Sequence, residues 1–244
     1  MYPPIRDDAD VRALEQTPLA ELLPAANAFE AVRQSAERHP ENIALKFLVP
    51  GDIDAPAAEI SYGRFIAACY RTANMFHDLG LRPGEVVSFL LPLCPQAYYT
   101  IIGGEAAGIV NAVNPLLEDG QIAKILKAAN TKILVVPSPA LSTEIWDKVA
   151  AVRDELPELS AILTVGGGGE GGGVRAFDEL LGQYPDDHLV SGREIQPDDI
   201  AAYFHTGGTT GTPKLAPHTH HMQVSQIWST GAALDFRSDD ILSV

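Results

Sequence analysis

Apolar residues along this chain recur at two spacings, one typical of helices and the other of strands. Residues 62–79 carry apolar side chains every three or four positions, and the next residue is Gly80, a type that commonly ends helices. Further helices are predicted at 95–107, 121–129 and 143–156, near 177–181, and from about 219 onward. Strands are predicted at 43–48, 85–91, 109–113, 132–136, 161–165 and 200–205, and residues 214–216 are expected to be extended.

Strands and helices alternate along most of the chain. Strands that are joined by helices of this length pair in parallel, through right-handed crossovers. The predicted class is therefore α/β, a mostly parallel sheet with flanking helices. In such sheets ligands bind at the carboxyl ends of the strands, and the strand at 200–205 ends directly before a segment rich in glycine and threonine.

That segment has the composition of a phosphate-binding loop. Its hydroxyl donors belong to Thr206, Thr209, Thr210 and Thr212. Its glycines are Gly207, Gly208 and Gly211. Glycines let backbone N–H groups approach a ligand closely, and branched threonine side chains lose little entropy when a hydroxyl is oriented. Lys214 closes the loop with a positive charge.

A P-loop of the nucleoside-triphosphatase kind is excluded here. That motif requires Gly, four residues, and then Gly-Lys-Ser/Thr at the start of a helix. Counted from Gly208, the second glycine position holds Pro213, and Leu215 stands where the hydroxyl that binds Mg²⁺ belongs. Pro213 also removes one N–H donor and disfavours a helical residue before it. The loop is therefore expected between two extended segments, with little contribution from a helix dipole.

The loop resembles the Thr/Ser/Gly-rich signature of the adenylate-forming (AMP-binding) superfamily. Residues 206–214 read TGGTTGTPK, and His220 follows where that family carries a histidine. Segments 60–65, 79–87 and 113–116 are similar to the family's N-terminal segments and occur in the same order. The resemblance covers roughly residues 28–244 and is to the acyl-CoA synthetase type. Three positions depart from the family pattern, namely Gly207 for serine, Leu215 for glycine and Met222 for asparagine.

The resemblance implies the N-terminal part of that family's large domain. It predicts an N-terminal extension at 1–27, an incomplete AMP-binding domain at 28–244 with a flexible glycine-rich loop at 166–173, and no C-terminal domain. Residues 239–244 look like part of a strand, so the chain is expected to be an N-terminal fragment that is inactive alone. A homodimer or another partner is one way to cover the surface that such a fragment exposes.

The resemblance also implies a reaction with ATP, Mg²⁺ and coenzyme A. A small-molecule carboxylic acid attacks the α-phosphorus of ATP to give an acyl-adenylate and pyrophosphate, and the thiol of coenzyme A then displaces AMP. Lys214 would be the catalytic residue that offsets the pyrophosphate charge. Thr206 would lie near Mg²⁺, and residues 206–212 would bind the phosphates through hydroxyls and amides.

The sequence also allows other interpretations. An aryl-CoA ligase or an amino-acid adenylation domain stays open, because the family's acid-selecting residues lie beyond Val244. A non-catalytic nucleotide-binding remnant stays open as well. The run 166–173 contains the Gly-x-Gly-x-x-Gly spacing of dinucleotide-binding oxidoreductases, but any run of glycines does. A zinc site is disfavoured for His205, His218, His220 and His221, because no cysteine lies nearby, and His220 is expected to pack the loop against the following helix.

Composition and charge narrow the function classes further. The 244 residues are 46% hydrophobic and carry a formal net charge of -15, which argues against nucleic-acid binding but not against a nucleotide held by local donors. The N-terminus lacks a signal-peptide pattern, and the best apolar stretch, 97–113, is too short and polar to span a membrane. A cytoplasmic location follows as the default.

Cys69 and Cys94 are expected to be reduced core thiols, and Val224 and Trp228 to be core residues.

Overall fold

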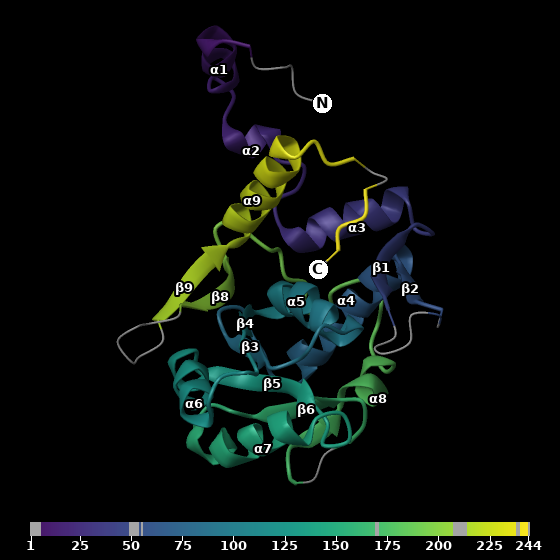
Figure 1. Ribbon diagram of the computed structural model, residues 1–244, viewed down its shortest axis with the longest axis vertical. Coiled ribbons are helices and arrows are strands. Elements are labelled where there is room, and N and C mark those ends of the chain that lie inside the picture. Colours follow the sequence, from purple (N-terminus) through teal and green to yellow (C-terminus); the bar gives the residue numbers. More distant parts are fainter. Residues whose placement is uncertain are drawn as a thin grey trace.

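A seven-stranded sheet with helices on both faces dominates the molecule (Figure 1). The computed structural model describes residues 6–48, 54, 56–168, 171–206, 214–237 and 240–243. In their order across the sheet, the strands are β7 (Val174–Ala176), β6 (Ala161–Val165), β5 (Thr131–Pro137), β3 (Val86–Phe89), β4 (Ile109–Ala112), β8 (Ile200–Thr206) and β9 (Lys214–Thr219). Neighbours from β7 to β8 pair in parallel, whereas β9 pairs antiparallel with β8. The α/β class with a mostly parallel sheet is confirmed.

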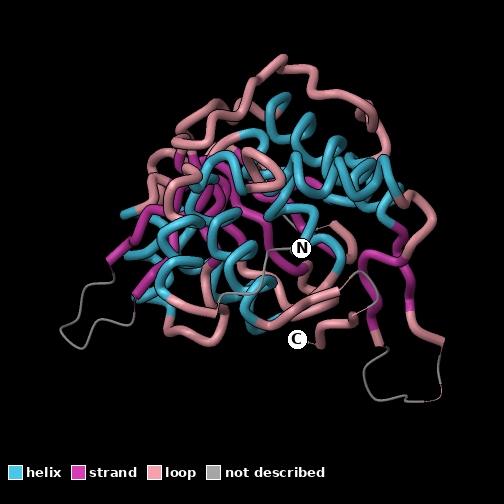
Figure 2. Tube along the Cα trace, turned by 90° about the horizontal axis from the view of Figure 1, so that it is seen from above, coloured by secondary structure: helices cyan, strands magenta, loops and turns pink. Residues whose placement is uncertain are grey.

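Two groups of helices cover the two faces of the sheet (Figures 1 and 2). One face carries α3 (Ala28–Arg38), α4 (Tyr62–Asp78), α5 (Pro95–Ala107) and α8 (Phe177–Leu181), and the other carries α6 (Asp119–Ala128) and α7 (Thr143–Val152). Apolar side chains of β5 point alternately to the two faces of the sheet, so helices must pack on both. Ile133 and Val135 join the core under α4 and α5, while Leu134 and Val136 join the core under α6 and α7.

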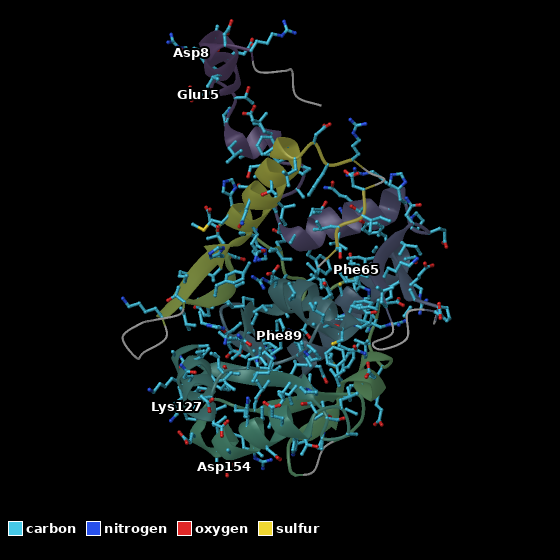
Figure 3. The ribbon with its side chains drawn as sticks, viewed as in Figure 1. Asp8, Glu15, Phe65, Phe89, Lys127 and Asp154 are labelled. Atoms are coloured by element: carbon cyan, nitrogen blue, oxygen red, sulfur yellow. The ribbon has the colours of Figure 1, made fainter. Side chains whose placement is uncertain are left out.

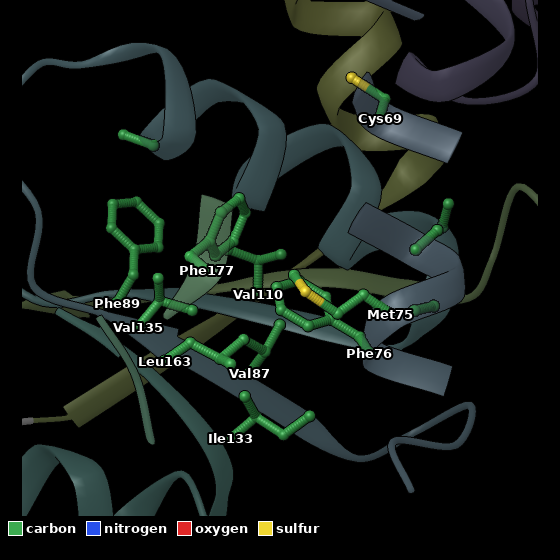
Figure 4. Close-up of a cluster of buried hydrophobic side chains, with 14 of the residues drawn as sticks. Cys69, Met75, Phe76, Val87, Phe89, Val110, Ile133, Val135, Leu163 and Phe177 are labelled. Atoms are coloured by element: carbon green, nitrogen blue, oxygen red, sulfur yellow. The ribbon is translucent and has the colours of Figure 1, made fainter. Parts of the chain in front are cut away.

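The larger core is built around aromatic side chains (Figure 4). The rings of Phe76 and Phe177 meet edge to face, with centroids 6.5 Å apart, over Val87 and Val110 of the sheet. The predicted stripe along 62–79 is confirmed, because Phe76 and Cys69 on it are fully buried. Both cysteines are free, but Cys94 is only half-buried, at the N-cap of α5, so the core prediction holds for Cys69 alone.

Helix α4 ends as the sequence predicts. Gly80 has a φ of 96°, and the N–H of Leu81 donates to the carbonyl of Phe76 at 2.9 Å. That bond and the one from Gly80 to His77 form a Schellman motif, which closes the last helical carbonyls. The predicted helix at 143–156 is shorter than expected, because α7 ends at Val152 and a 3-10 turn, Arg153–Glu155, follows.

Several elements lie outside the main layers. A two-stranded antiparallel sheet joins β1 (Ile43–Phe47) to β2 (Ala58–Ser61), and Ser61 caps the start of α4. The N-terminal α1 (Asp8–Leu14) and α2 (Leu19–Leu22) precede α3, and Figure 3 places Asp8 and Asp154 at opposite ends of the molecule. The last helix, α9 (His220–Ala233), follows β9. Among the helices of the described ranges, none has the length and apolarity needed to cross a bilayer.

Two features near the C-terminus refine the sequence-based picture. Residues 240–243 are not in a strand, so the predicted strand at 239–244 is wrong for that described part. A strand needs a pairing partner, and no other described strand pairs there. The edge strand β9 contains Pro217, which lies opposite Tyr203 of β8. Seven residues, 207–213, separate β8 from β9, which is too few for the crossover that parallel strands need, and the two strands form a ribbon and pair antiparallel.

Candidate functional site

The β8–β9 ribbon carries both ends of the predicted phosphate-binding loop at the carboxyl edge of the sheet. Thr206 lies directly opposite Lys214, and its Oγ1 donates to the Lys214 carbonyl at 3.5 Å. Opposed residues of an antiparallel pair project to the same face. The hydroxyl of Thr206 and the ammonium of Lys214 therefore leave the ribbon on one side. The predicted ligands Gly207, Gly208, Thr209, Thr210, Gly211 and Thr212 lie outside the described residues.

Lys214 has the features of a cation that is available to a ligand. Its side chain is exposed, and within the described ranges its ammonium makes no ion pair. Most other lysines behave differently; Lys46, for example, pairs with Glu59 at 2.8 Å and Lys132 pairs with Glu85 at 2.5 Å. In a chain with a net charge of -15, an unpaired ammonium beside a hydroxyl is suited to an anionic group such as a phosphate.

A second loop, the one after β4, lies against the end of β8. The backbone N–H of Asn114 donates to Nε2 of His205 at 3.3 Å, which joins this loop to the end of β8 at the carboxyl edge. Within that second loop, the N–H of Leu116 donates to Oδ1 of Asn114 at 2.9 Å. From α7, the ammonium of Lys148 donates to the Pro115 carbonyl at 3.1 Å. The family-like segment 113–116 thus lies beside the end of β8, where the predicted phosphate-binding loop begins.

Sequence reasoning missed two residues at this edge, His205 and Lys148. His205 was considered only as one member of a histidine cluster, although its place immediately before Thr206 was a usable signal. Lys148 lies on a helix whose face could not be oriented from the sequence alone. Among the described residues, no group of three or more His, Cys, Asp or Glu is placed so that it could hold a metal ion.

The opposite, amino edge of the sheet contains a buried polar cluster that no motif predicted. We call it the amino-edge cluster; its members are Glu105, Arg193, Asp199, His220 and Gln223. Arg193 donates to the carbonyls of Glu105 and Ala106 at 3.3 and 3.2 Å, and to Oδ2 of Asp199 at 3.0 Å. It thereby satisfies carbonyls in the last turn of α5, which have no partner within the helix.

Two members of the amino-edge cluster have strongly shifted pKa values. Burial raises the pKa of Glu105 to about 7, although Gln223 donates to its Oε1 at 2.8 Å. Burial likewise lowers the pKa of His220 to about 4, because the charged imidazolium loses its water. The His220 side chain is fully buried, and its backbone N–H donates to the Asp199 carbonyl at 3.1 Å. These groups fasten the start of α9 to α5.

The amino edge also has a cavity, of about 520 Å³, lined by the segment between α2 and α3, by Pro197 and by His221. Its carboxylate, Glu30, already binds Arg33 at 2.7 Å and Gln34 at 2.8 Å. That pairing holds the pKa of Glu30 below its ordinary value. The cavity is therefore neither next to the phosphate-binding segment nor provided with a free charged group.

Comparison with known proteins decides the family. The family model described as "AMP-binding enzyme" matches residues 32–244, which is most of the chain. The chain belongs to the AMP-binding enzymes. This agrees with the resemblance that the loop and the upstream segments carry in the sequence. The matched region includes the sheet, the carboxyl edge with Thr206 and Lys214, and the amino-edge cluster.

Individual AMP-binding enzymes give the scale of the similarity. The marinolic acid–CoA ligase of Pseudoalteromonas sp. (strain SANK 73390) is 33% identical over 216 residues, which cover 88% of this chain and 33% of that protein. The 4-coumarate–CoA ligase 2 of Solanum tuberosum is 31% identical over 177 residues, 70% of this chain and 30% of that protein. The chain thus spans about a third of the length of these curated relatives.

Solved structures support the fold. A long-chain-fatty-acid–CoA ligase from Archaeoglobus fulgidus superimposes with a TM-score of 0.75 at 20% identity, covering 89% of this chain and 41% of that one. An anthranilate–CoA ligase in complex with anthranoyl-AMP gives a TM-score of 0.68 at 22% identity, covering 84% and 36%. At these identities the likeness is one of fold. It places the seven-stranded sheet among the domains of AMP-binding enzymes.

Proposed function

We propose that this chain forms the ATP-phosphate-binding portion of an acid–thiol ligase that makes acyl-CoA. A carboxylate oxygen of the acid attacks the α-phosphorus of ATP, the bond to the β-phosphate oxygen breaks, and pyrophosphate leaves. The sulfur of coenzyme A then attacks the acyl carbon, AMP leaves, and the thiol proton goes to solvent or a base. The single observation that supports this role most directly is the exposed Lys214 opposite Thr206 at the carboxyl edge, whose ammonium has no ion-pair partner among the described residues.

In this proposal Lys214 offsets the negative charge that grows on pyrophosphate as it leaves. Thr206 and the following hydroxyls and amides, through Thr212, orient the phosphates, so that the α-phosphorus faces the acid. Positioning and charge neutralisation are the main demands that nucleotidyl transfer makes on a protein. Mg²⁺, held by phosphate oxygens with the Thr206 hydroxyl close by, would supply further charge neutralisation.

The acid itself belongs to the proposal. We infer an organic carboxylic acid, with a fatty-acid-like substrate as the first candidate. An aryl acid is the second, favoured by the similarity to the 4-coumarate–CoA ligase of Solanum tuberosum.

A cytoplasmic location also stays a prediction. The proposed homodimer is supported by exposed apolar side chains on α9, such as Met222 and Ile227, and sedimentation of a monomer at micromolar concentration would contradict it.

The experiment measures MgATP binding by titration calorimetry to the wild-type chain and to Lys214→Met. A hydrogen bond to a charged group contributes roughly 1.5 to 3 kcal/mol, so the dissociation constant is expected to rise by roughly tenfold to a hundredfold. Thr209→Ala combined with Thr210→Ala is expected to weaken binding as well. Lys46→Met is the matched control, because Lys46 pairs with Glu59 on the separate small sheet. Unchanged affinity in Lys214→Met would contradict the proposal.

A further inference from the structure

His205 makes the last contact between β4 and β8 before the phosphate-binding segment begins. The register of these parallel strands ends with Ala112 opposite Phe204. Just past that point, the imidazole of His205 accepts a hydrogen bond from the backbone N–H of Asn114, at 3.3 Å. A side chain therefore continues the connection where the paired backbones end.

This contact fixes the chemical form of the imidazole. Nε2 can accept a hydrogen bond only when it carries no proton, so the ring is neutral and its hydrogen is on Nδ1. The acceptor also meets a well-held donor, because the loop of Asn114 is fixed from two sides. Leu116 donates to the Asn114 side chain, and Lys148 of α7 donates to the Pro115 carbonyl.

The position of His205 matters because Thr206 follows it directly and lies opposite Lys214. The ribbon formed by β8 and β9 is bound to the rest of the sheet through β8 alone among the described strands. Past the last paired residues of β4 and β8, the imidazole therefore links the end of β8 to the loop after β4. A displacement there would move the hydroxyl and the ammonium together, relative to the loop after β4.

We propose that His205 is a positioning residue for phosphate binding: its neutral imidazole ties the end of β8 to Asn114 and thereby holds Thr206 and Lys214 in place for the phosphates. This role rests on the proposed function of the loop. His205 does not contact the reacting atoms in this role. The contact restricts the ribbon before a nucleotide binds, so less conformational entropy is lost on binding. This is how preorganisation increases affinity.

The same ribbon offers a matched control in His218. That residue lies on β9 and is half-buried like His205, but its ring packs on Phe204, with centroids 4.7 Å apart. It makes no hydrogen bond to the loop after β4 in the described structure. A loss of imidazole at 218 therefore changes the ribbon without breaking the connection to Asn114.

The experiment compares His205→Gln, His205→Asn and His205→Ala with His218→Gln. The amide oxygen of glutamine reaches the place of Nε2, whereas that of asparagine reaches only the place of Nδ1. We expect His205→Gln to bind MgATP within twofold of wild type, and His205→Asn and His205→Ala to bind roughly threefold to tenfold more weakly, the scale of one hydrogen bond. His218→Gln is expected to bind as wild type does.

Two further readouts separate positioning from a general loss of structure. Hydrogen exchange at the Asn114 amide should quicken in His205→Asn and His205→Ala, and stay slow in His205→Gln. In the wild-type chain, ¹⁵N NMR of labelled histidine should show His205 with the proton on Nδ1. A proton on Nε2, or equal MgATP affinity in all three His205 variants, would overturn the proposal. If Lys214→Met also binds MgATP normally, the proposed function itself fails; if only the His205 variants are normal, the positioning role alone fails.

Discussion

The two edges of the central sheet use polar residues in opposite ways. At the carboxyl edge, Thr206 and Lys214 are exposed and the ammonium has no ion-pair partner among the described residues. At the amino edge, Glu105 and His220 are buried, and Arg193 is hydrogen-bonded to two helix carbonyls and a carboxylate. The first arrangement leaves donors available for a ligand. The second uses its donors internally, to join α5 to α9.

This contrast bears on how functional sites are recognised. Strongly shifted pKa values are often taken to mark active sites. Here the values of about 7 for Glu105 and about 4 for His220 belong to the edge that lacks the family's signature loop. Burial alone accounts for most of both shifts. In this protein the perturbed pKa values belong to a buried cluster that links α5 to α9, whereas the proposed site has an exposed ammonium without an ion-pair partner among the described residues.

The largest expected effect comes from breaking the amino-edge cluster at Arg193. Arg193→Met leaves the carbonyls of Glu105 and Ala106 without their side-chain donor and removes the ion-pair partner of Asp199, whose Oδ2 keeps the hydrogen bond from the Gln196 N–H. Removing one partner of a fully buried pair costs about 3 to 5 kcal/mol, and because Asp199 is partly exposed we expect about 2 to 4 kcal/mol. Urea unfolding measures this loss as a change in the free energy of unfolding. Lys127→Met, which breaks an exposed pair with Glu155, should cost less than about 1 kcal/mol, and equal losses in both variants would remove the contrast.

The next effect is a pH dependence of stability caused by Glu105. Its pKa in the folded chain, about 7, lies above its ordinary value of 4.5, so the unfolded chain releases this proton first as pH rises. The Glu105 contribution to stability is therefore complete below pH 4.5 and is lost as pH rises towards 7. Relative to wild type, Glu105→Gln should gain about 3 kcal/mol in free energy of unfolding between pH 4.5 and pH 7.5.

His220 supplies the matched control for this measurement. Its pKa is lowered from 6.5 to about 4, so its contribution is present above pH 6.5 and is lost as pH falls towards 4. Between pH 4.5 and 6.5, rising pH lowers the free energy of unfolding through Glu105 and raises it through His220. The two changes should nearly cancel in wild type. Replacing His220 with leucine should leave a stability that falls with rising pH. A difference between Glu105→Gln and wild type that does not vary with pH would show that the carboxyl is not perturbed.

The smallest expected effect is on stability at the carboxyl edge. Lys214 is exposed and unpaired within the described chain, so Lys214→Met should change the free energy of unfolding by no more than about 0.5 kcal/mol. The same variant is expected to weaken MgATP binding strongly. A stability loss of 2 kcal/mol in urea unfolding would show that both edges are structural, and the contrast between them would disappear.

Much of the sheet could be predicted from the sequence because its strands are buried on both faces. Val86–Phe89 and Ala161–Val165 are buried along their whole length and are apolar except for Ser88 and Thr164. The end of a helix could also be predicted where a single residue determines it, as Gly80 does for α4. The family followed from the loop beginning at Thr206, whose composition is rare enough to be specific.

The amino-edge cluster could not be predicted in the same way. Glu105, Arg193 and Gln223 come from distant parts of the chain, and each residue type is ordinarily exposed. They come together only in the folded chain, where α5, α9 and the segment that precedes β8 meet. The contact between His205 and Asn114 has the same origin, since it depends on the register of β4 and β8. The position and ligand contacts of Gly207 through Thr212 stay predictions.

The edge strand β9 bears on how this protein avoids unwanted assembly. An edge strand offers its free N–H and C=O groups as a template on which a strand of another chain can add. Pro217 in β9 has no N–H, and proline in sheets is confined to edges and to positions where no ladder bond is needed. An incoming strand would find its ladder interrupted in the middle of β9. The proline thus makes the ribbon, which carries both ends of the predicted loop, a poorer template for a strand of another chain.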